Sequence, residues 1–245
     1  MDDLKPYMKL AEIYDQLMDH VDYDYWSNYI LKLIHLTGKK VDTVIDISCG
    51  TGNLINHLQE KISILYGCDN SKEMIFKAKK KKSKNSKYLF INDIRNMAIR
   101  ESCFDCALLL YDSLNYLIDD ISLDNALKEI NRILKKGGIF IFDVVSENHC
   151  IKYFGDFHES EYWNNSGYSR HSYYDPLNRY QFNEFRIVIK GETFFEKHQQ
   201  KIYNIEYLKT VLESKAFKII GTYDDFSEQG SDQNFGRIHF LCTKL

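Results

Sequence analysis

The stretch VDTVIDISCGTGN, residues 41–53, decides the fold. Its first seven residues are mostly β-branched or apolar and predict a buried strand, and the small residues that follow predict a tight loop into a helix at 54–61. Asp46 lies near the end of that strand, and Gly50 and Gly52 leave the loop backbone open to close approach. A strand, a glycine-containing loop and a helix in this order predict a ligand site.

Strands and helices alternate beyond this loop. Apolar strands are predicted at 62–69, 87–93, 104–110 and 139–145. Helices are predicted at 71–81, capped by Ser71, and at 122–136, ended by Gly137-Gly138. Such strands, separated by helices, are typical of a parallel sheet covered on both faces, so residues 41–145 should form a doubly wound α/β unit with its ligand at the carboxyl edge of the sheet.

The flanking segments have other patterns, and with them the chain divides into four predicted parts. Helical spacing predicts helices at 8–19 and 24–36. Tyrosine-rich alternation predicts an antiparallel meander with strands at 168–175, 179–190 and 193–203 and a tight hairpin at Lys190-Gly191-Glu192-Thr193. A helix at 205–215 and strands at 217–226 and 235–245 should rejoin the main sheet. The parts are an N-terminal helical cap (1–40), a ligand-binding core (41–145), an antiparallel lid insertion (146–203) and a segment that completes the core sheet (204–245).

Composition narrows the class of protein. A chain of 245 residues fits one large domain or one domain with an insertion, and its 32 basic and 35 acidic residues, net charge −3, argue against a main role in gripping nucleic acid. The lysine-rich stretch 77–87 fits a solvated helix end better, because no arginine or aromatic residue is interleaved. No apolar run approaches the ~18 residues of a membrane helix, and the first residues lack the apolar core of a secretory signal. We therefore expect a cytoplasmic protein whose six cysteines are thiols.

Several motif interpretations fail. A dinucleotide-binding G-x-G-x-x-G would need its third glycine at Ile55, and a P-loop would need Gly-Lys-Ser/Thr. Cys103 and Cys106 form a C-x-x-C without a second ligand pair, so we expect them to be structural. Four histidines have no metal-ligand spacing, so no metal site is predicted, and none is paired with a Ser or Cys nucleophile. They are expected on the surface or in the lid: His149, His158, His171 and His198.

Five motifs follow one another along the chain: VIDISCGTGN (44–53), GCDNSKEM (67–74), IND (91–93), FDCALLLYDSLNYL (104–117) and LKKGGIFIFDV (134–144). Together they resemble the ordered motifs of class I S-adenosylmethionine (AdoMet)-dependent methyltransferases, across residues 41–145 and with a shared tail pattern beyond. The resemblance implies a seven-stranded Rossmann-like methyltransferase sheet with the antiparallel insertion after strand five, and AdoMet as the cofactor. One departure is Ser48, where the family's loop usually has glycine.

The resemblance also implies the cofactor contacts. The Asp46 carboxylate and the loop amides would hold the methionyl part, Asp69 the ribose hydroxyls and Asp93 the adenine amino group, with Asn70 and Met74 against the adenine. The residues that it assigns to cofactor binding are Tyr23, Trp26, Asp46, Ser48, Cys49, Gly50, Gly52, Asn53, Asp69, Asn70, Met74, Asp93, Ile94, Leu110 and Tyr111.

The leading segment 10–30 resembles that of small-molecule N-methyltransferases, including amino-sugar and glycine-type enzymes. A tyrosine of the first helix reaches the acceptor in those enzymes, which implies Tyr14, while Tyr23 and Trp26 would line the mouth; alternatively, Tyr14 and Trp26 are core aromatic residues. Tyr116 occupies the place of a histidine in the amino-sugar enzymes, so Tyr14 and Tyr116 are the candidate catalytic residues. Candidate acceptor contacts from the lid are Trp163, Tyr168, His171, Tyr173 and Tyr180.

The expected function is transfer of a methyl group from AdoMet to a small-molecule acceptor, preferably an amine nitrogen, by a monomer or homodimer and without a metal. An O-methyltransferase stays open. A nucleic-acid base methyltransferase is disfavoured by the net charge and by the sequence at 111–114, which is not of the Asn-Pro-Pro-Tyr type. A non-catalytic AdoMet-binding regulator is the alternative outside enzymes; AdoMet would stabilise it as well, but only an enzyme would form S-adenosylhomocysteine with an acceptor.

Overall fold

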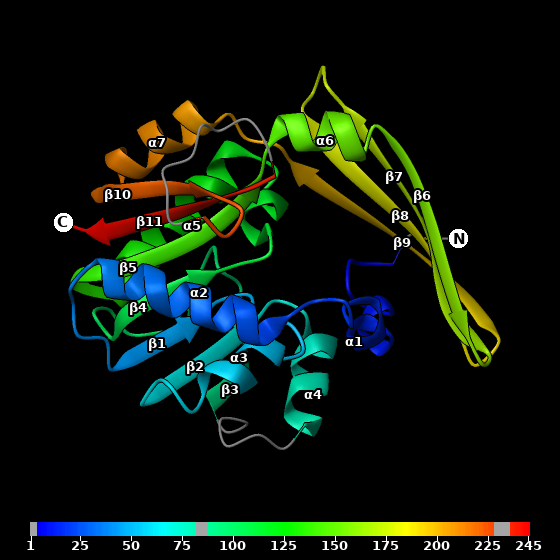
Figure 1. The fold of residues 1–245 in the computed structure, drawn as a ribbon, viewed down its shortest axis with the longest axis horizontal. Coiled ribbons are helices and arrows are strands. Elements are labelled where there is room, and N and C mark those ends of the chain that lie inside the picture. Colours follow the sequence, from blue (N-terminus) through cyan, green and yellow to red (C-terminus); the bar gives the residue numbers. More distant parts are fainter. Residues whose placement is uncertain (1–3, 82–87, 228–235) are drawn as a thin grey trace.

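A seven-stranded sheet forms the main body of this computed structural model, which describes residues 4–81, 88–227 and 236–245. The strand order is β10-β11-β5-β4-β1-β2-β3 (Figure 1). The strands β1 to β5 are parallel, and β11 runs antiparallel to both β5 and β10. This topology confirms the predicted sheet. The strands are β1 (Thr43–Asp46), β2 (Ile64–Asp69), β3 (Leu89–Ile91), β4 (Phe104–Leu109), β5 (Leu134–Val145), β10 (Phe217–Asp224) and β11 (Arg237–Lys244).

Helices cover both faces of this sheet because consecutive residues of the central strands are apolar, which makes both faces of the sheet apolar. Along β5, Phe140 and Phe142 face the cluster that contains helices α5 and α7, whereas Ile139 and Ile141 face the cluster that contains α2, α3 and α4 (Figure 1). As predicted, the Ser71 hydroxyl caps α4 by accepting a hydrogen bond from the Met74 amide at 3.2 Å. The helices are α2 (Tyr23–Leu36), α3 (Asn53–Leu58), α4 (Lys72–Lys80), α5 (Asp120–Ile133) and α7 (Ile205–Ser214).

Two predicted helices have different bounds in the structure. The segment predicted as a helix over 8–19 is a short 3-10 helix, η1 (Leu10–Glu12), followed by a single turn, α1 (Tyr14–Leu17), because the backbone turns out of helical geometry at Ile13. The helix predicted to end at Gly137-Gly138 ends earlier, at Ile133. Leu134 already pairs with Phe104 of β4, so the two lysines that follow belong to β5.

The insertion forms a second, four-stranded antiparallel sheet in the order β6-β7-β8-β9, which stands beside the main body (Figure 1). The three predicted strands are present, and the predicted hairpin is confirmed by left-handed φ values of 51° at Lys190 and 88° at Gly191. The sequence analysis missed strand β6 and the helix before it. The elements are α6 (Glu147–Tyr153), β6 (Asp156–Trp163), β7 (Ser166–Asp175), β8 (Tyr180–Ile189) and β9 (Glu192–Lys201).

The N-terminal segment, residues 4–17, lies between the main body and the second sheet (Figure 1). Leu10 and Ile13 pack against Tyr168, Phe185 and Ile187 of the second sheet. On the opposite side, Lys77 and Lys81, at the end of α4, form ion pairs with Glu12 and Asp15 of the segment at 2.7 Å and 2.8 Å. The N-terminal segment therefore joins the two sheets.

Two expectations from the composition concern the lysine-rich stretch and helices that could cross a membrane. The lysine-rich stretch is described as far as residue 81, where Lys77 and Lys81 pair with acidic side chains of the N-terminal segment; its residues 82–87 lie outside the described part. Within the described ranges, every helix is too short or too polar to cross a membrane.

Candidate functional site

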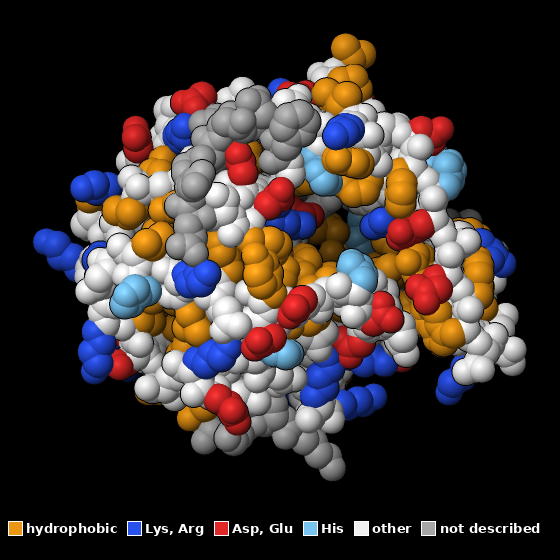
Figure 2. All heavy atoms as spheres, in the orientation of Figure 1, with side chains coloured by type: hydrophobic (Ala, Val, Ile, Leu, Met, Phe, Trp, Pro, Cys, Tyr) orange, Lys and Arg blue, Asp and Glu red, His pale blue; other side chains and the backbone are white. Residues whose placement is uncertain are grey.

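A cavity of about 870 Å³ lies at the carboxyl ends of β1, β2 and β4. Loops that follow these strands form its floor, and Leu4, Tyr7 and Tyr14 of the N-terminal segment line it from the other side. The surface is hollowed where the main body and the second sheet face each other (Figure 2). The volume falls in the range of about 300–1,000 Å³ that is usual for small-molecule sites.

Most of the residues predicted for the site line this cavity: Tyr14, Tyr23, Asp46, Ser48, Cys49, Gly50, Asn53, Asp69, Asn70, Met74, Asp93, Ile94, Leu110, Tyr111 and Tyr116. Gly52 and Trp26 do not. Gly52 is the left-handed residue, φ 78°, that begins α3, and an added Cβ would lie 3.3 Å from Ala78. Trp26 is buried behind Tyr111, with ring centroids 4.5 Å apart, so the prediction that it lines the mouth is wrong and its core alternative holds.

Two carboxyl groups, the buried Asp46 and the half-buried Asp69, face the cavity from the ends of adjacent strands. Asp46 is 3% exposed and accepts one long hydrogen bond, 3.3 Å from the Ser48 amide. Asp69 accepts hydrogen bonds from the amides of Gly50 at 2.9 Å and Ser71 at 2.8 Å. Burial raises the pKa of Asp46 to about 7 and that of Asp69 to about 6, against the opposing effect of these hydrogen bonds. Each group can therefore gain from a hydrogen-bond donor or a cation in the cavity.

Other polar residues of the cavity are already paired. The Asp93 carboxylate accepts three hydrogen bonds from the Arg95 guanidinium, including one of 2.6 Å from Nη2, and this contact lowers the pKa of Asp93. The Ser48 hydroxyl donates to the Leu110 carbonyl at 3.4 Å, which links the loop after β1 to the end of β4. An adenine amino group at Asp93 would have to share the carboxylate with Arg95.

A corner of unusual backbone shapes the cavity after β4. Tyr111 and Asp112 both have left-handed φ values, 59° and 48°, which are rare for residues other than glycine. The buried Asp143 carboxylate accepts hydrogen bonds from both of their amides at 2.8 Å, and Arg237 bridges Asp112 and Asp143. The sequence analysis missed Asp143 and Arg237, although an acid inside the apolar strand sequence IFIFDVV was a signal for Asp143.

The residues predicted as acceptor contacts from the lid lie elsewhere. Trp163 and Tyr168 pack against the N-terminal segment, and the Tyr180 hydroxyl donates to the Ile118 carbonyl at 3.3 Å. His171 and Tyr173 lie on the outer face of the second sheet, because successive strand residues point to opposite faces. None of these five side chains lines the described cavity, so the prediction is wrong. On the inner face of the second sheet, β9 carries three buried polar side chains that were not predicted: Glu196, His198 and Gln200.

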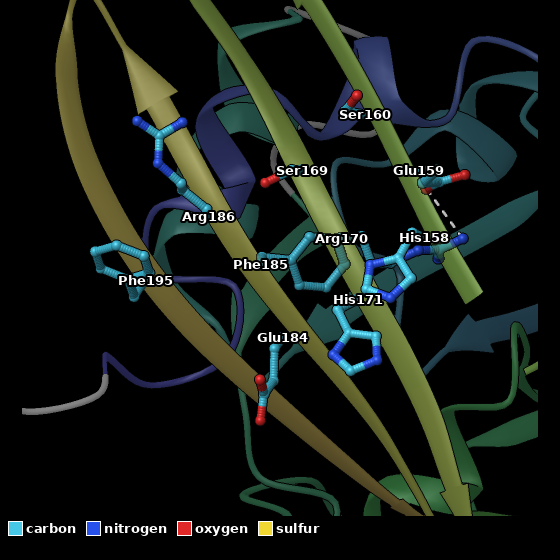
Figure 3. A pocket seen from close by; sticks show the side chains of 10 residues that line it. All are labelled: His158, Glu159, Ser160, Ser169, Arg170, His171, Glu184, Phe185, Arg186 and Phe195. Carbon is cyan, nitrogen blue, oxygen red and sulfur yellow. Dashed lines mark ion pairs between the residues drawn. The ribbon is translucent and has the colours of Figure 1, made fainter. Parts of the chain in front are cut away.

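The histidines occupy three kinds of position. His158 and His171 stack at 4.1 Å on the outer face of the second sheet, where both rings approach Asp156; Figure 3 shows them side by side. The possible ligand atoms of these three residues lie close enough to one another to hold a metal ion. This corrects the expectation that the spacing of the histidines excludes such a group. His149 is half-buried in α6. His198 is 1% exposed and belongs to β9 of the second sheet, so of the two predicted places it lies in the lid insertion and not on the surface.

The cysteines are free thiols, as expected. Cys103 and Cys106 of the C-x-x-C lie at the start of β4, where Cys106 is fully buried among apolar side chains and Cys103 is partly exposed. Burial raises the pKa of the Cys106 thiol far above its ordinary value. This environment fits a structural role.

The chain matches known methyltransferases over nearly its whole length. A family model described as a methyltransferase domain matches residues 45–142. The chain is 30% identical over 244 residues to YqeM of Bacillus subtilis (strain 168), which is named as a methyltransferase, covering 97% of each chain. A crystal structure of an S-adenosylmethionine-dependent methyltransferase from Clostridium acetobutylicum superimposes with a TM-score of 0.83 at 28% identity, covering 97% of this chain and 98% of that one. A structure of CalS10 with S-adenosylmethionine bound, an amino pentose methyltransferase from Micromonospora, superimposes with a TM-score of 0.74 at 14% identity over all of both chains.

The protein therefore belongs to the class I AdoMet-dependent methyltransferases. It is an enzyme of this class, with AdoMet as its cofactor. The residues of the cavity fit that group. The nearly unpartnered Asp46 carboxyl suits an amino group, the two oxygens of Asp69 keep lone pairs for hydroxyls, and Gly50, at φ 53°, leaves its backbone uncovered beside the Tyr14 ring.

The raised pKa values of Asp46 and Asp69 predict that AdoMet binds more weakly as the pH falls through about 7 and then about 6. In the roles that the resemblance implies, each carboxyl would be ionised to hold its part of the ligand, so binding should release protons in this range. Calorimetry in two buffers with different ionisation heats measures the protons released. Asp46→Asn should remove the upper part of the pH dependence, and an affinity that is independent of pH would contradict the assignment of both groups.

The same two carboxyl groups predict that the ligand-free protein becomes less stable as the pH rises, although AdoMet binding becomes stronger. A carboxyl whose folded pKa is raised stabilises the fold fully only below its unfolded pKa of about 4. That contribution is lost as the pH rises through the folded values of about 6 and about 7. Saturating AdoMet should offset the loss.

Proposed function

We propose that this enzyme methylates a small-molecule acceptor at an amine nitrogen. The observation that carries the proposal is a set of five tyrosines that line the same cavity as the two carboxyl groups: Tyr7, Tyr14, Tyr23, Tyr111 and Tyr116. Aromatic faces and phenol oxygens suit an acceptor that becomes positively charged as it is methylated. The fold shared with an amino pentose methyltransferase supports an amine over other nucleophiles.

The proposed roles follow from the positions of the side chains. Asp46 would hold the cationic amino group of AdoMet, Asp69 its ribose hydroxyls, and Met74 and Ile94 its adenine. When bound, AdoMet supplies an electrophilic methyl group on a sulfonium. The chain's own task is alignment of the acceptor and exclusion of water, which suffices for large rate effects because the leaving group is good.

The N-terminal segment and the second sheet would exclude water from this cavity. Tyr7 and Tyr14 meet edge to face with ring centroids 5.9 Å apart, and burial raises the pKa of both well above the usual value. Both therefore remain neutral phenols that donate or accept hydrogen bonds. An amine can be bound as the neutral base in such surroundings, because desolvation disfavours its ammonium form.

A panel of acceptors tests the proposal. Purified protein is first titrated with AdoMet in a calorimeter and then incubated with AdoMet and with amines, amino sugars, phenols and carboxylic acids, and S-adenosylhomocysteine is measured. Turnover of amines supports the proposal, and turnover of oxygen nucleophiles alone overturns it. Tight binding of AdoMet with no turnover on any acceptor would favour a regulatory protein.

Tyr14→Phe is expected to leave the dissociation constant of AdoMet within about twofold and to lower kcat about tenfold. The ring keeps its packing beside Gly50, while one hydrogen bond to the acceptor, of about 1–1.5 kcal/mol, is lost. Calorimetry and steady-state kinetics measure the two quantities. Tyr25→Phe on α2, with a side chain 52% exposed, is the matched control and should change neither. Equal loss of AdoMet affinity and turnover would contradict the role of Tyr14 in acceptor binding.

We also propose the four parts 1–40, 41–145, 146–203 and 204–245 as the functional division of the chain, and a cytoplasmic monomer or homodimer that does not act on nucleic acid. Six free thiols suit a reducing compartment. The near balance of charge supports a small-molecule acceptor over a polyanion.

A further inference from the structure

A chain of four polar side chains runs from the cavity into the protein interior. Tyr7 and Tyr116 line the cavity, and their hydroxyl oxygens lie 2.7 Å apart. The Tyr116 oxygen lies 3.0 Å from Nδ1 of His198, and Nε2 of that ring lies 3.1 Å from Oε2 of Glu196. His198 and Glu196 are 1% and 2% exposed. The four residues come from three separate segments: the N-terminal segment, the 3-10 helix η3 (Ser113–Tyr116) and β9.

The surroundings of Glu196 set the direction of these hydrogen bonds. Its carboxylate accepts from the amides of Tyr7 at 2.8 Å and Leu10 at 3.0 Å, and also from the amide of Lys9. An ionised carboxylate only accepts, so Nε2 of His198 donates to Glu196. In a neutral imidazole Nδ1 is then the acceptor, the Tyr116 hydroxyl donates to it, and the Tyr7 hydroxyl donates to Tyr116.

This chain of four side chains contains one imidazole, the kind of side chain whose ordinary change of protonation lies closest to neutral pH. Burial raises the pKa of Tyr7 and of Tyr116 well above the usual value, so both stay as phenols and can only pass a proton on. Imidazole is the side chain that gains and loses a proton in this pH range. A carboxylate on the far nitrogen holds the ring in one orientation and stabilises its protonated form, as in hydrolytic triads.

The other ionisable groups near this chain are mostly acidic. Besides Glu196, Asp112 acts on both tyrosines and Asp69 acts on Tyr7 from the end of β2. Arg237 of β11 is committed to Asp112 and Asp143. The apolar neighbours are the rings of Phe185 at 5.1 Å from His198 and of Tyr7, which meets it edge-on at 4.7 Å. A positive charge on His198 would thus form in acidic surroundings that are shielded from water.

We propose that His198, oriented by Glu196, receives the proton that the acceptor loses on methylation; this rests on the proposed function. The acceptor's lone pair forms the bond to the methyl carbon, the electrons of the broken C–S bond stay on sulfur, and those of the broken N–H bond stay on nitrogen. The released proton goes to the Tyr7 oxygen, the Tyr7 proton to Tyr116, and the Tyr116 proton to Nδ1 of His198. His198 accepts the proton through the tyrosines. Glu196 is a positioning residue that acts through His198. After the products leave, the imidazolium returns its proton to solvent.

Nitrogen NMR of the imidazoles tests the direction of the chain without AdoMet or an acceptor. In protein labelled with ¹⁵N at histidine, the His198 signals are assigned by their loss in His198→Asn. We expect the tautomer with hydrogen on Nε2, and a shift of the Nδ1 resonance in Tyr116→Phe, which removes its donor. A tautomer with hydrogen on Nδ1, or an Nδ1 resonance that Tyr116→Phe leaves unchanged, overturns the proposal.

Kinetics test the consequence, with an amine found in the acceptor panel. His198→Asn should lower kcat about 100-fold, keep the AdoMet dissociation constant within about twofold and flatten the rise of kcat with pH. A purely structural role would leave the shape of the pH profile unchanged, and that result overturns the proposal. His171→Asn, on the outer face of the same sheet, is the matched control and should behave as wild type. Absence of AdoMet binding by the wild type would instead refute the proposed function, while the NMR result still decides the direction of the chain.

Discussion

Asp69→Ala is expected to weaken AdoMet binding about 100-fold. The carboxylate would lose two charge-assisted hydrogen bonds to the ribose hydroxyls, each worth about 1.5 kcal/mol or more, and a loss of about 1.4 kcal/mol is tenfold in affinity. The substitution also leaves the amides of Gly50 and Ser71 without their acceptor, which loosens the loops at the ends of β1 and β2.

Calorimetric titration with AdoMet measures this effect. The matched control is Asp156→Ala, which removes a carboxylate from an exposed position on the second sheet and should leave the affinity unchanged. Asp69→Asn keeps the shape of the side chain and should have an intermediate effect, because the amide still offers one acceptor oxygen. If AdoMet binds Asp69→Ala as tightly as wild type, Asp69 does not hold the cofactor.

Phe142→Ala is expected to lower the free energy of unfolding by about 3–5 kcal/mol, which is the usual cost of a cavity left by a buried phenylalanine. Phe142 is completely buried, and its ring stacks on those of Phe140 at 4.8 Å and Phe240 at 4.6 Å. These three rings join β5 to β11, which carries Arg237 to the corner after β4. The substitution should therefore weaken both the sheet and the corner after β4.

Thermal unfolding measures this loss, and a chain of this size should show a lower Tm by about 10 °C. The matched control is Phe195→Ala on the second sheet, where the side chain is 46% exposed and the expected change is within about 0.5 kcal/mol. An unchanged Tm for Phe142→Ala would mean that the apolar cluster under α5 and α7 does not limit stability.

The main sheet could be predicted from the sequence, because a local pattern marks each of its strands and helices and this alternation repeats along the chain. Apolar strands such as 104–110 and 139–145 alternate with helices, and the short loops between them leave few topologies. The motif at Asp46 and the acid at Asp69 were placed correctly at the cavity, since each directly follows or ends a strand.

The other half of the site could not be predicted from local patterns. Glu196 and His198 alternate with exposed residues in a polar strand, and nothing in the sequence shows which face of that strand turns inward. Their partners Tyr7 and Tyr116 are more than eighty residues away along the chain. Trp26 illustrates the reverse error: a large aromatic residue at helical spacing was assigned to the mouth but packs in the core.

The hydrogen bonds that the amides of Tyr7, Lys9 and Leu10 donate to Glu196 have a consequence for synthesis on the ribosome. The two ends of this contact are separated by as many as 189 positions, so these three amides lack their carboxylate acceptor until β9 has been made. The parallel strands β1 to β5 precede β9 in the chain and can assemble beforehand, whereas β10 and β11 join the main sheet only after β9 has been made.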